Sequence, residues 1–262
     1  MIKNILVIGS TGNLGKILLK YCHKNNIKID AITSFKNESL QKKQQKSYNI
    51  KKGFCLNKFN ETIDFKKYLL TKKFKFVYFL DYGSYSLTYI DLILKNNSNT
   101  YICIANKEMI IAGGTYLIKK IGKTGNKLIP LDSEHFSLTN SNISNNTIDK
   151  IYITASGGPF YFKKKINLNN VSLDQVLNHP KWEMGFNNSI DSSNFINKIL
   201  EILELSIIFD VDMNKIDFLV TKEAYIHSLI FYKNSTISFN CFDNNMLIPL
   251  ASPLIEVFNS KK

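Results

Sequence analysis

Short, unbroken apolar runs recur through the first half of the chain, and they limit the folds that it can adopt. Runs of this length are typical of parallel strands that are buried on both faces. The apolar runs are residues 5–8, 76–80 and 100–105, and two further strands are expected at residues 29–32 and 127–131. The stretches with helical patterning between them include residues 16–22, 86–94 and 110–121. Strands that alternate with helices predict an α/β fold with a parallel sheet.

A glycine-containing stretch follows the first apolar run and precedes a predicted helix. A strand, a glycine turn and a helix in this order are the context of a dinucleotide-binding loop, where glycines let the backbone approach a pyrophosphate and the helix N-terminus supplies N–H groups. A turn with only a structural role stays an alternative, because the spacing Gly-x-x-Gly-x-x-Gly is not the commonest fingerprint. The candidate cofactor-binding residues here are Gly9, Ser10, Thr11, Gly12, Asn13 and Leu14.

The end of the second predicted strand bears on the choice of cofactor. NAD-binding sheets usually have an acid there, which binds the ribose hydroxyls. In this chain no acid occurs at the strand end before Glu38, and Lys36 and Asn37 are present instead. A lysine favours NADPH, because its ammonium group can bind the 2′-phosphate. The polar residues 42–52 predict a solvated helix and loop.

Two acids separated by one residue follow the predicted strand at residues 127–131. In an extended segment alternate side chains point to the same side, so Asp132 and Glu134 would aim at one point. Two convergent carboxylates need a cation or a shared proton, and oxygen ligands suit Mg²⁺ or Mn²⁺. The alternative is a pair of solvated surface acids, which is common at this spacing.

Polar residues also follow the run at residues 100–105, at the carboxyl end of a predicted strand. Open α/β sheets bind ligands at this edge. Asn106, Lys107 and Glu108 are therefore candidates for the cofactor site, and Lys107 would bring a cation next to cofactor and substrate. A surface lysine is the alternative.

A second glycine turn occurs in the other half of the chain. A predicted strand at residues 151–154 leads into Ser156 and a glycine pair, which allows close approach of the backbone to an anion with Ser156 as donor. Residues 156–188 are predicted to form a lid, because regular patterning fades there and closing loops exclude water. The lid contains His179, Trp182 and Met184, for which packing onto a local core is the alternative. A β-hairpin is predicted from residues 226–232 and 236–242.

The clearest helical pattern covers residues 191–209. It places Asn197, Lys198 and Glu201 on one polar face, since residues three and four apart are neighbours on a helix. A phosphate at the helix N-terminus would contact Ser192, Asn197 and Lys198, with Glu201 one turn deeper as a metal ligand. A solvated helix face is the alternative.

Size and composition exclude several classes of protein. At 262 residues, with 44% hydrophobic residues, the chain is globular and long enough for two domains. The formal net charge of +13 suggests an anionic partner, but all 34 basic residues are Lys, and sequence-specific DNA readers depend on the Arg fork. We therefore expect no nucleic acid partner, and the lysines suggest an AT-rich bacterial genome. We also expect a cytoplasmic protein with reduced thiols, because there is no signal peptide, Cys-x-x-Cys pair or apolar run of about 18 residues.

A series of motifs runs through most of the chain. The motifs are Ile104-Ala105-Asn106-Lys107-Glu108, Pro130-Leu131-Asp132-Ser133-Glu134-His135, Ala155-Ser156-Gly157-Gly158-Pro159-Phe160, His179-Pro180-Lys181-Trp182-Glu183-Met184-Gly185, Ile190-Asp191-Ser192, and Asn197-Lys198 with Glu201. In this order and at these spacings they resemble the 1-deoxy-D-xylulose 5-phosphate reductoisomerase family. The resemblance extends from Ile5 to about Pro249.

This resemblance implies an NADPH- and metal-dependent enzyme. Such an enzyme converts 1-deoxy-D-xylulose 5-phosphate to 2-C-methyl-D-erythritol 4-phosphate in non-mevalonate isoprenoid biosynthesis. The implied architecture is a Rossmann-like NADPH-binding domain over residues 1–131 and an α+β catalytic domain over residues 132–262, with the lid at residues 156–188 and without the family's usual C-terminal helical domain. We also expect a homodimer that binds a sugar phosphate and no membrane.

The resemblance also implies roles for individual residues. The ligands of Mg²⁺ or Mn²⁺ would be Asp132, Glu134 and Glu201, and the other catalytic residues would be Lys107 and His179. The substrate phosphate would be held by Ser156, Ser192, Asn197 and Lys198. Other substrate contacts would come from Ser133 and Trp182, with Glu134, His179 and Glu201. The cofactor would be bound by the glycine loop, Lys36, Asn37, Asn106, Lys107, Glu108, Met184 and Gly185.

The chain departs from the family pattern in several places. Tyr161 replaces an Arg, Ile199 replaces a Gly, and other motifs are replaced by Asp81-Tyr82-Gly83-Ser84, Asn187-Asn188-Ser189 and Thr221-Lys222-Glu223-Ala224. Two alternatives therefore stay open, namely a non-catalytic paralogue that binds NADPH or a partner protein, and another NADPH-dependent reductase on the same scaffold. Retention of the three acids argues against the paralogue, because buried acids without a metal are costly.

Overall fold

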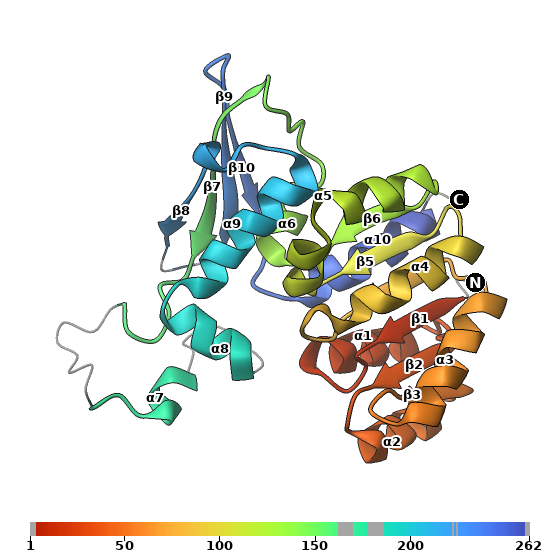
Figure 1. Ribbon diagram of the computed structural model, residues 1–262. Helices are drawn as coiled ribbons and strands as arrows, with labels where there is room; N and C mark the ends of the chain where they lie inside the picture. Colours follow the sequence, from red (N-terminus) through yellow and green to blue (C-terminus); the bar gives the residue numbers. More distant parts are fainter. Residues whose placement is uncertain (1–3, 162–169, 178–185, 222, 224, 260–262) are drawn as a thin grey trace. The chain divides into compact units, whose positions relative to one another are not determined.

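The structure, a computed structural model, describes residues 4–161, 170–177, 186–221, 223 and 225–259 of the chain (Figure 1). The chain divides into two compact units. The first comprises residues 1–132 together with residues 245–262, and the second comprises residues 133–244. The predicted second domain included the C-terminal residues, whereas in the structure these residues belong to the first unit.

A six-stranded sheet forms the centre of the first unit (Figure 1). The strand order is β3-β2-β1-β4-β5-β6, and all neighbouring strands run parallel. The predicted α/β class with a parallel sheet is confirmed. The strands are β1 (Ile5–Ile8), β2 (Ala31–Ser34), β3 (Lys52–Cys55), β4 (Phe76–Phe79), β5 (Tyr101–Ile104) and β6 (Lys127–Pro130).

Helices cover both faces of this sheet, and consecutive residues of β1 and β4 are all buried for that reason. The apolar composition of these strands follows from burial on both sides. Their burial stabilises the unit through the hydrophobic effect, at roughly 25 cal/mol per Å² of apolar surface. The helices of this unit are α1 (Asn13–Lys24), α2 (Glu38–Tyr48), α3 (Phe59–Thr71), α4 (Leu87–Asn96), α5 (Lys107–Lys123) and α10 (Leu247–Asn259), with a short 3₁₀ turn η1 (Ser84–Ser86).

Helix α10 explains why the C-terminal residues join the first unit. Its Leu250, Leu254 and Val257 lie at helical spacing and are buried in the same cluster as the inward side chains of α1 and β1. The hydroxyl of Tyr78 on β4 also donates to the Leu250 carbonyl at 3.0 Å. Both contacts join segments far apart in the sequence, so local patterning could not reveal them.

The second unit is built on a mixed four-stranded sheet with the order β10-β9-β7-β8. Strand β7 pairs in parallel with β8 and antiparallel with β9, and β9 and β10 form the predicted hairpin. Strand β8 was not predicted. The elements of this unit are α6 (Ser133–Phe136), β7 (Ile148–Ala155), α7 (Leu173–Leu177), α8 (Phe186–Ser193), α9 (Ile196–Phe209), η3 (Met213–Lys215), β8 (Ile216–Val220), β9 (Ile226–Tyr232) and β10 (Ile237–Cys241).

The prediction of one continuous helix over residues 191–209 is wrong. Helix α8 ends at Ser193, and α9 begins at Ile196. Phe195 between them has a φ of 63°, which is a left-handed conformation that interrupts a right-handed helix. Within the described part of the chain, no helix combines the length and apolar character that crossing a bilayer requires.

Candidate active site

Three acidic side chains converge where β6 ends. Asp132, Glu134 and Glu201 each offer a carboxylate oxygen, and these oxygens lie within 4.8 Å of one another. The extended segment expected for Asp132 to Glu134 is not formed, because the short helix α6 begins at Ser133. Glu134 therefore comes from a helical turn, and Glu201 comes from α9, where it is almost completely buried. The convergence was correctly predicted, but through a different local geometry.

Lys198 neutralises part of this acidic group. Its ammonium nitrogen lies 2.9 Å from Glu134 Oε1 and 2.5 Å from Glu201 Oε2, and it also donates to the Thr154 carbonyl at the end of β7. Burial lowers the pKa of Lys198, but the negative charges of Glu134 and Glu201 outweigh burial and hold that pKa above its usual value. Lys198 is thus a charged lysine in contact with two of the three acids.

Asn197 also contacts this group, since its side-chain amide donates to Glu201 Oε1 one turn farther along α9. The predicted polar face of Asn197, Lys198 and Glu201 is therefore a connected set of polar contacts. Ser133 belongs to the same region, where its hydroxyl donates to Glu134 Oε2.

Lys107 provides a second positive charge, for Asp132. Its ammonium nitrogen lies 3.1 Å from Asp132 Oδ2, and the lysine side chain is buried. Lys107 stands at the first position of α5, behind the N-cap Asn106, whose side-chain oxygen accepts from the Met109 amide at 3.0 Å. The cap fixes the start of the helix and thereby the direction in which Lys107 leaves the backbone.

The two segments predicted to bind a phosphate come together. Gly158 has a φ of +68°, and a Cβ atom there would lie 2.7 Å from the Ser192 carbonyl oxygen. Only glycine permits this contact without a shift, which brings the turn that contains Ser156 against the end of α8. Ser192 lies in α8 and not at the N-terminus of the helix that carries Asn197, where the sequence analysis expected it. His179, Trp182, Met184 and Gly185 lie outside the described residues, and so does part of the predicted lid.

The first glycine loop is tightly packed against the sheet. A Cβ atom on Gly9 would lie 2.5 Å from the Asp81 amide nitrogen, and one on Gly15 would lie 2.5 Å from the Ser10 carbonyl oxygen. Gly12 is the N-cap of α1 and supplies no side chain to its first turn. Ser10 is completely buried, and its hydroxyl donates to Gln44 Oε1 at 2.9 Å, so this side chain serves the fold.

The turn after β2 contains the residues predicted to select the cofactor. Lys36 is exposed there, and Asn37 caps α2 by accepting from the Leu40 amide at 3.2 Å. Glu38, the first acid after the strand, is paired with Lys42 and Lys58. Hydrogen bonds from these lysines lower the pKa of Glu38 to about 2. The only nearby acid in this turn is therefore already bound to cations.

Asp81, next to the glycine loop, is a partly buried acid that the sequence singled out only as part of a departure from the family pattern. It accepts hydrogen bonds from Ser86 Oγ at 2.5 Å and from Asn106 Nδ2 at 3.4 Å. Burial raises the pKa of Asp81 to about 6, although these hydrogen bonds act in the opposite direction. The sequence signal that could have identified Asp81 is its position directly after the apolar run at residues 76–80.

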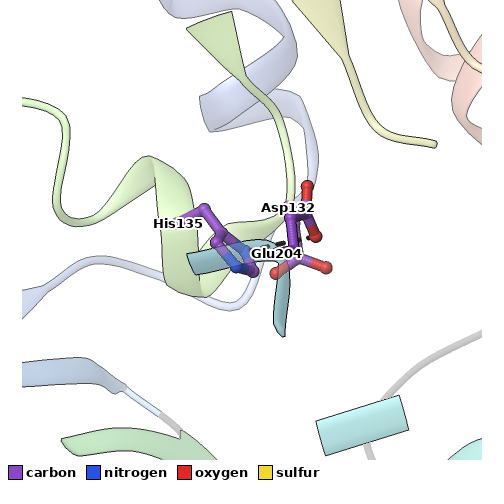
Figure 2. Close-up of side chains that lie close together, drawn as sticks. All are labelled: Asp132, His135 and Glu204. Atoms are coloured by element: carbon purple, nitrogen blue, oxygen red, sulfur yellow. Dashed lines mark ion pairs between the residues drawn. The ribbon is translucent and has the colours of Figure 1, made fainter. Parts of the chain in front are cut away.

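His135 and Glu204 are a second pair that sequence analysis did not select (Figure 2). Both are completely buried, and His135 Nδ1 lies 3.7 Å from Glu204 Oε2. Together with Asp132 they form a second group of potential ligand atoms within 4.8 Å of one another. The available signals were the position of His135 directly after Glu134 and the spacing of Glu204 three residues after Glu201.

Comparison with known proteins decides the family. A sequence model described as the 1-deoxy-D-xylulose 5-phosphate reductoisomerase C-terminal domain matches residues 128–209. The 1-deoxy-D-xylulose 5-phosphate reductoisomerase of Pelagibacter ubique is 33% identical over 282 aligned residues, which cover 99% of this chain and 72% of that protein. The chain belongs to the 1-deoxy-D-xylulose 5-phosphate reductoisomerase family. The family member from Acetivibrio thermocellus is 32% identical and covers 95% of this chain, with 70% of its own length aligned.

Solved structures of the reductoisomerase family share the fold. The Zymomonas mobilis enzyme, described in complex with NADPH, has a TM-score of 0.79 at 23% identity and covers 97% of this chain and 70% of its own. A second reductoisomerase, in complex with NADPH, fosmidomycin and magnesium, has a TM-score of 0.82 at 24% identity, again over 97% of this chain and over 69% of that chain. The predicted class of enzyme, an NADPH-dependent oxidoreductase, is the class of these relatives.

Proposed function

We propose that the chain is a reductoisomerase that converts 1-deoxy-D-xylulose 5-phosphate to 2-C-methyl-D-erythritol 4-phosphate with NADPH and a divalent metal ion. The observation that carries the proposal is the group of Asp132, Glu134 and Glu201, whose carboxylate oxygens lie within 4.8 Å of one another. Its support comes from the family of the chain and from the lysines that contact these acids.

The donor set fits a hard divalent cation. Three carboxylates supply only oxygen atoms, which Mg²⁺ and Mn²⁺ prefer. Lys107 contacts Asp132, and Lys198 contacts Glu134 and Glu201, so both lysines lie beside the oxygen atoms that a cation would share. When bound, the metal would act as a Lewis acid that polarises the substrate carbonyl and orients the neighbouring hydroxyl.

The chain's own residues would bind and orient the substrate. Ser156 and the end of α8 at Ser192 form the turn that would receive the phosphate group, where Gly158 lets the two segments approach. Lys198, charged and next to both Glu134 and Glu201, would supply the cation for that phosphate. Lys107 would orient the Asp132 carboxylate through their contact at 3.1 Å.

The cofactor site would lie at the carboxyl end of the parallel sheet. In the order β3-β2-β1-β4-β5-β6 the chain reverses direction across the sheet between β1 and β4, and dinucleotides bind at such a switch point. The glycine loop follows β1, and Lys36 follows β2. The Zymomonas mobilis relative is described with NADPH, which supports the same cofactor here.

A non-catalytic relative is the second candidate, and the departures from the family pattern favour it. Tyr161 is exposed where the family has an Arg, and Ile199 is exposed where the family has a Gly. Neither residue contributes a group that the carboxylate cluster needs, whereas all three acids and both lysines are present. Catalysis therefore has the stronger support.

The test is NADPH oxidation by the full chain with 1-deoxy-D-xylulose 5-phosphate and Mn²⁺. We expect a rate that requires both the substrate and the metal. Substrate-independent oxidation, or none at saturating substrate with NADPH binding shown separately, would favour the non-catalytic relative. Assembly as a homodimer stays a prediction. Analytical ultracentrifugation of the same sample would measure the molecular mass and so test it.

A further inference from the structure

His135 and Glu204 form a buried pair with no direct part in the proposed reaction. Both side chains are completely buried, and Figure 2 shows the imidazole of His135 beside the carboxylate of Glu204. The distance from His135 Nδ1 to Glu204 Oε2 is 3.7 Å. An acid and a histidine at zero exposure cost folding free energy relative to apolar side chains of the same size, so their presence calls for a specific role.

The contacts of His135 indicate this role. Its other ring nitrogen, Nε2, lies 2.8 Å from the main-chain carbonyl oxygen of Glu201. A carbonyl oxygen only accepts hydrogen bonds, so Nε2 is the donor and its proton is fixed by this contact. The imidazole therefore joins α6, on which Glu134 lies directly before His135, to the backbone of Glu201 on α9.

The Glu204 carboxylate lies beside the other ring nitrogen, with Oε2 3.7 Å from Nδ1. It lies three residues after Glu201 on α9, which places the two acids on adjacent turns of the same helix face. The imidazole of His135 thus contacts two residues of α9, the backbone of Glu201 and the side chain of Glu204. These contacts link α6, which carries Glu134, to α9, which carries Glu201.

We propose that His135 and Glu204 are positioning residues that set Glu134 and Glu201 for a divalent cation. The inference rests on the proposed function for the presence of that cation. Groups outside the ligand shell that orient metal ligands typically contribute 10- to 100-fold to metal affinity. In this role the pair does not bind the metal ion but fixes the positions of the Glu134 and Glu201 carboxylates.

The test compares Mn²⁺ affinity by isothermal titration for the full chain, Glu204→Gln and Asp210→Asn. Glu204→Gln keeps the shape of the side chain, and we expect it to bind Mn²⁺ about 10- to 100-fold more weakly, with one ion per chain. Asp210→Asn is the matched control, because it removes one acid from the exposed end of α9 and keeps a residue that tolerates the left-handed φ of 53°. We expect its affinity to be unchanged.

The melting temperature without metal separates positioning from a merely structural role. A structural role would lower the melting temperature of Glu204→Gln and leave the Mn²⁺ affinity of the folded protein unchanged, which would overturn the proposal. If Glu204→Gln does not fold, His135→Gln replaces it, because the glutamine amide can still donate to the Glu201 carbonyl. We expect His135→Gln to show a smaller but measurable loss of Mn²⁺ affinity. Wild-type Mn²⁺ affinity in His135→Gln would overturn the proposal.

Two further outcomes are distinct. A second Mn²⁺ per chain that Glu204→Gln removes would make Glu204 a ligand together with Asp132 and His135, and would overturn the positioning role. Absence of Mn²⁺ binding to the unmodified chain would instead contradict the metal centre of the proposed function, and this inference would fail with it.

Discussion

Lys198 is the residue on which the charge of the carboxylate group most depends. Its ammonium nitrogen contacts Glu134, Glu201 and the Thr154 carbonyl, while Lys107 contacts Asp132. Among the contacts between described residues, two ammonium groups thus face three carboxylates. A divalent cation and Lys198 would therefore share the attraction of the same two acids, which makes Lys198 both a stabilising group and a competitor of the metal.

Lys198→Met should lower stability without metal and enlarge the stabilisation by metal. Removal of one partner from a buried ion pair costs about 3–5 kcal/mol, because the acids stay buried without it. Added Mn²⁺ should then raise the melting temperature of Lys198→Met by more than that of the unmodified chain. Lys150→Met is the control, since Lys150 pairs with Asp217 at 3.9 Å near the surface. Equal Mn²⁺-induced shifts in all three proteins would contradict the competition.

Asp81→Asn should stabilise the protein in a pH-dependent way. The pKa of Asp81 is raised from 3.8 to about 6 in the folded chain, so the folded state binds the extra proton between these values and loses stability as pH rises through them. Well below pH 3.8 the acid is protonated in both states and has no effect on stability. At pH 7 or above the charged form costs roughly 3 kcal/mol, at about 1.4 kcal/mol per pKa unit.

Chemical denaturation from pH 4 to pH 8 measures this effect. The stability of Asp81→Asn relative to the unmodified chain should rise between about pH 4 and pH 6 and then stay constant. Asp64→Asn, at an exposed position on α3, is the control. A stability difference for Asp81→Asn that is the same at all pH values would contradict the raised pKa of Asp81.

At the scale of elements, turns and helix starts place the functional groups. The turn after β7 approaches α8 through Gly158, and the turn after β2 presents Lys36. Sequence patterning located both turns, because glycine pairs and strand ends are local signals. It did not find the interruption at Phe195, since a left-handed φ at an aromatic residue has no local signature and depends on packing such as the contact of Phe195 with Phe218.

Gly158→Ala should damage the predicted phosphate turn. A Cβ atom there would meet the Ser192 carbonyl oxygen at 2.7 Å, and the φ of +68° disfavours alanine by about 1–2 kcal/mol. We expect lower stability and a higher KM for the phosphorylated substrate. Gly122→Ala is the matched control, because no atom lies within 4 Å of its added Cβ and helix α5 should gain up to about 1 kcal/mol. An unchanged KM in Gly158→Ala would separate this turn from substrate binding.

Lys36→Ala should reduce the preference for NADPH. The exposed lysine at the end of β2 would bind the 2′-phosphate, and one charge-assisted contact is worth about 1.5–3 kcal/mol. The KM for NADPH should rise about 10- to 100-fold, while the KM for NADH should not change. Lys43→Ala, an exposed lysine on α2, is the control. Equal preference for the two cofactors in the unmodified chain would contradict the role of Lys36.

At the scale of the whole molecule, the sequence predicted most of the first sheet and the acids of the site. Continuous apolar runs are sufficient to predict β1, β4 and β5, because these strands are buried on both faces. Strand β3 escaped prediction because its first residue is exposed and its second is glycine. The contacts of Lys198, the His135–Glu204 pair and the packing of α10 join distant segments, so only the tertiary structure reveals them.

The family of the chain is established, and its catalytic activity is a matter for experiment. The relatives from Pelagibacter ubique and Acetivibrio thermocellus align over 72% and 70% of their own length. The central claim is that the group around Glu201 is the reaction centre of a working reductoisomerase. The claim therefore depends on whether this chain forms product, and on whether Glu201 is needed for that product.

The measurement that tests this claim most directly is detection of 2-C-methyl-D-erythritol 4-phosphate by mass spectrometry. The unmodified chain and Glu201→Gln are each incubated with 1-deoxy-D-xylulose 5-phosphate, NADPH and Mn²⁺. Glu201→Gln removes one carboxylate of the three within 4.8 Å and preserves side-chain size. We expect product from the unmodified chain and none from Glu201→Gln, which should still bind NADPH. Product from both proteins at equal rates, or from neither, would contradict this claim.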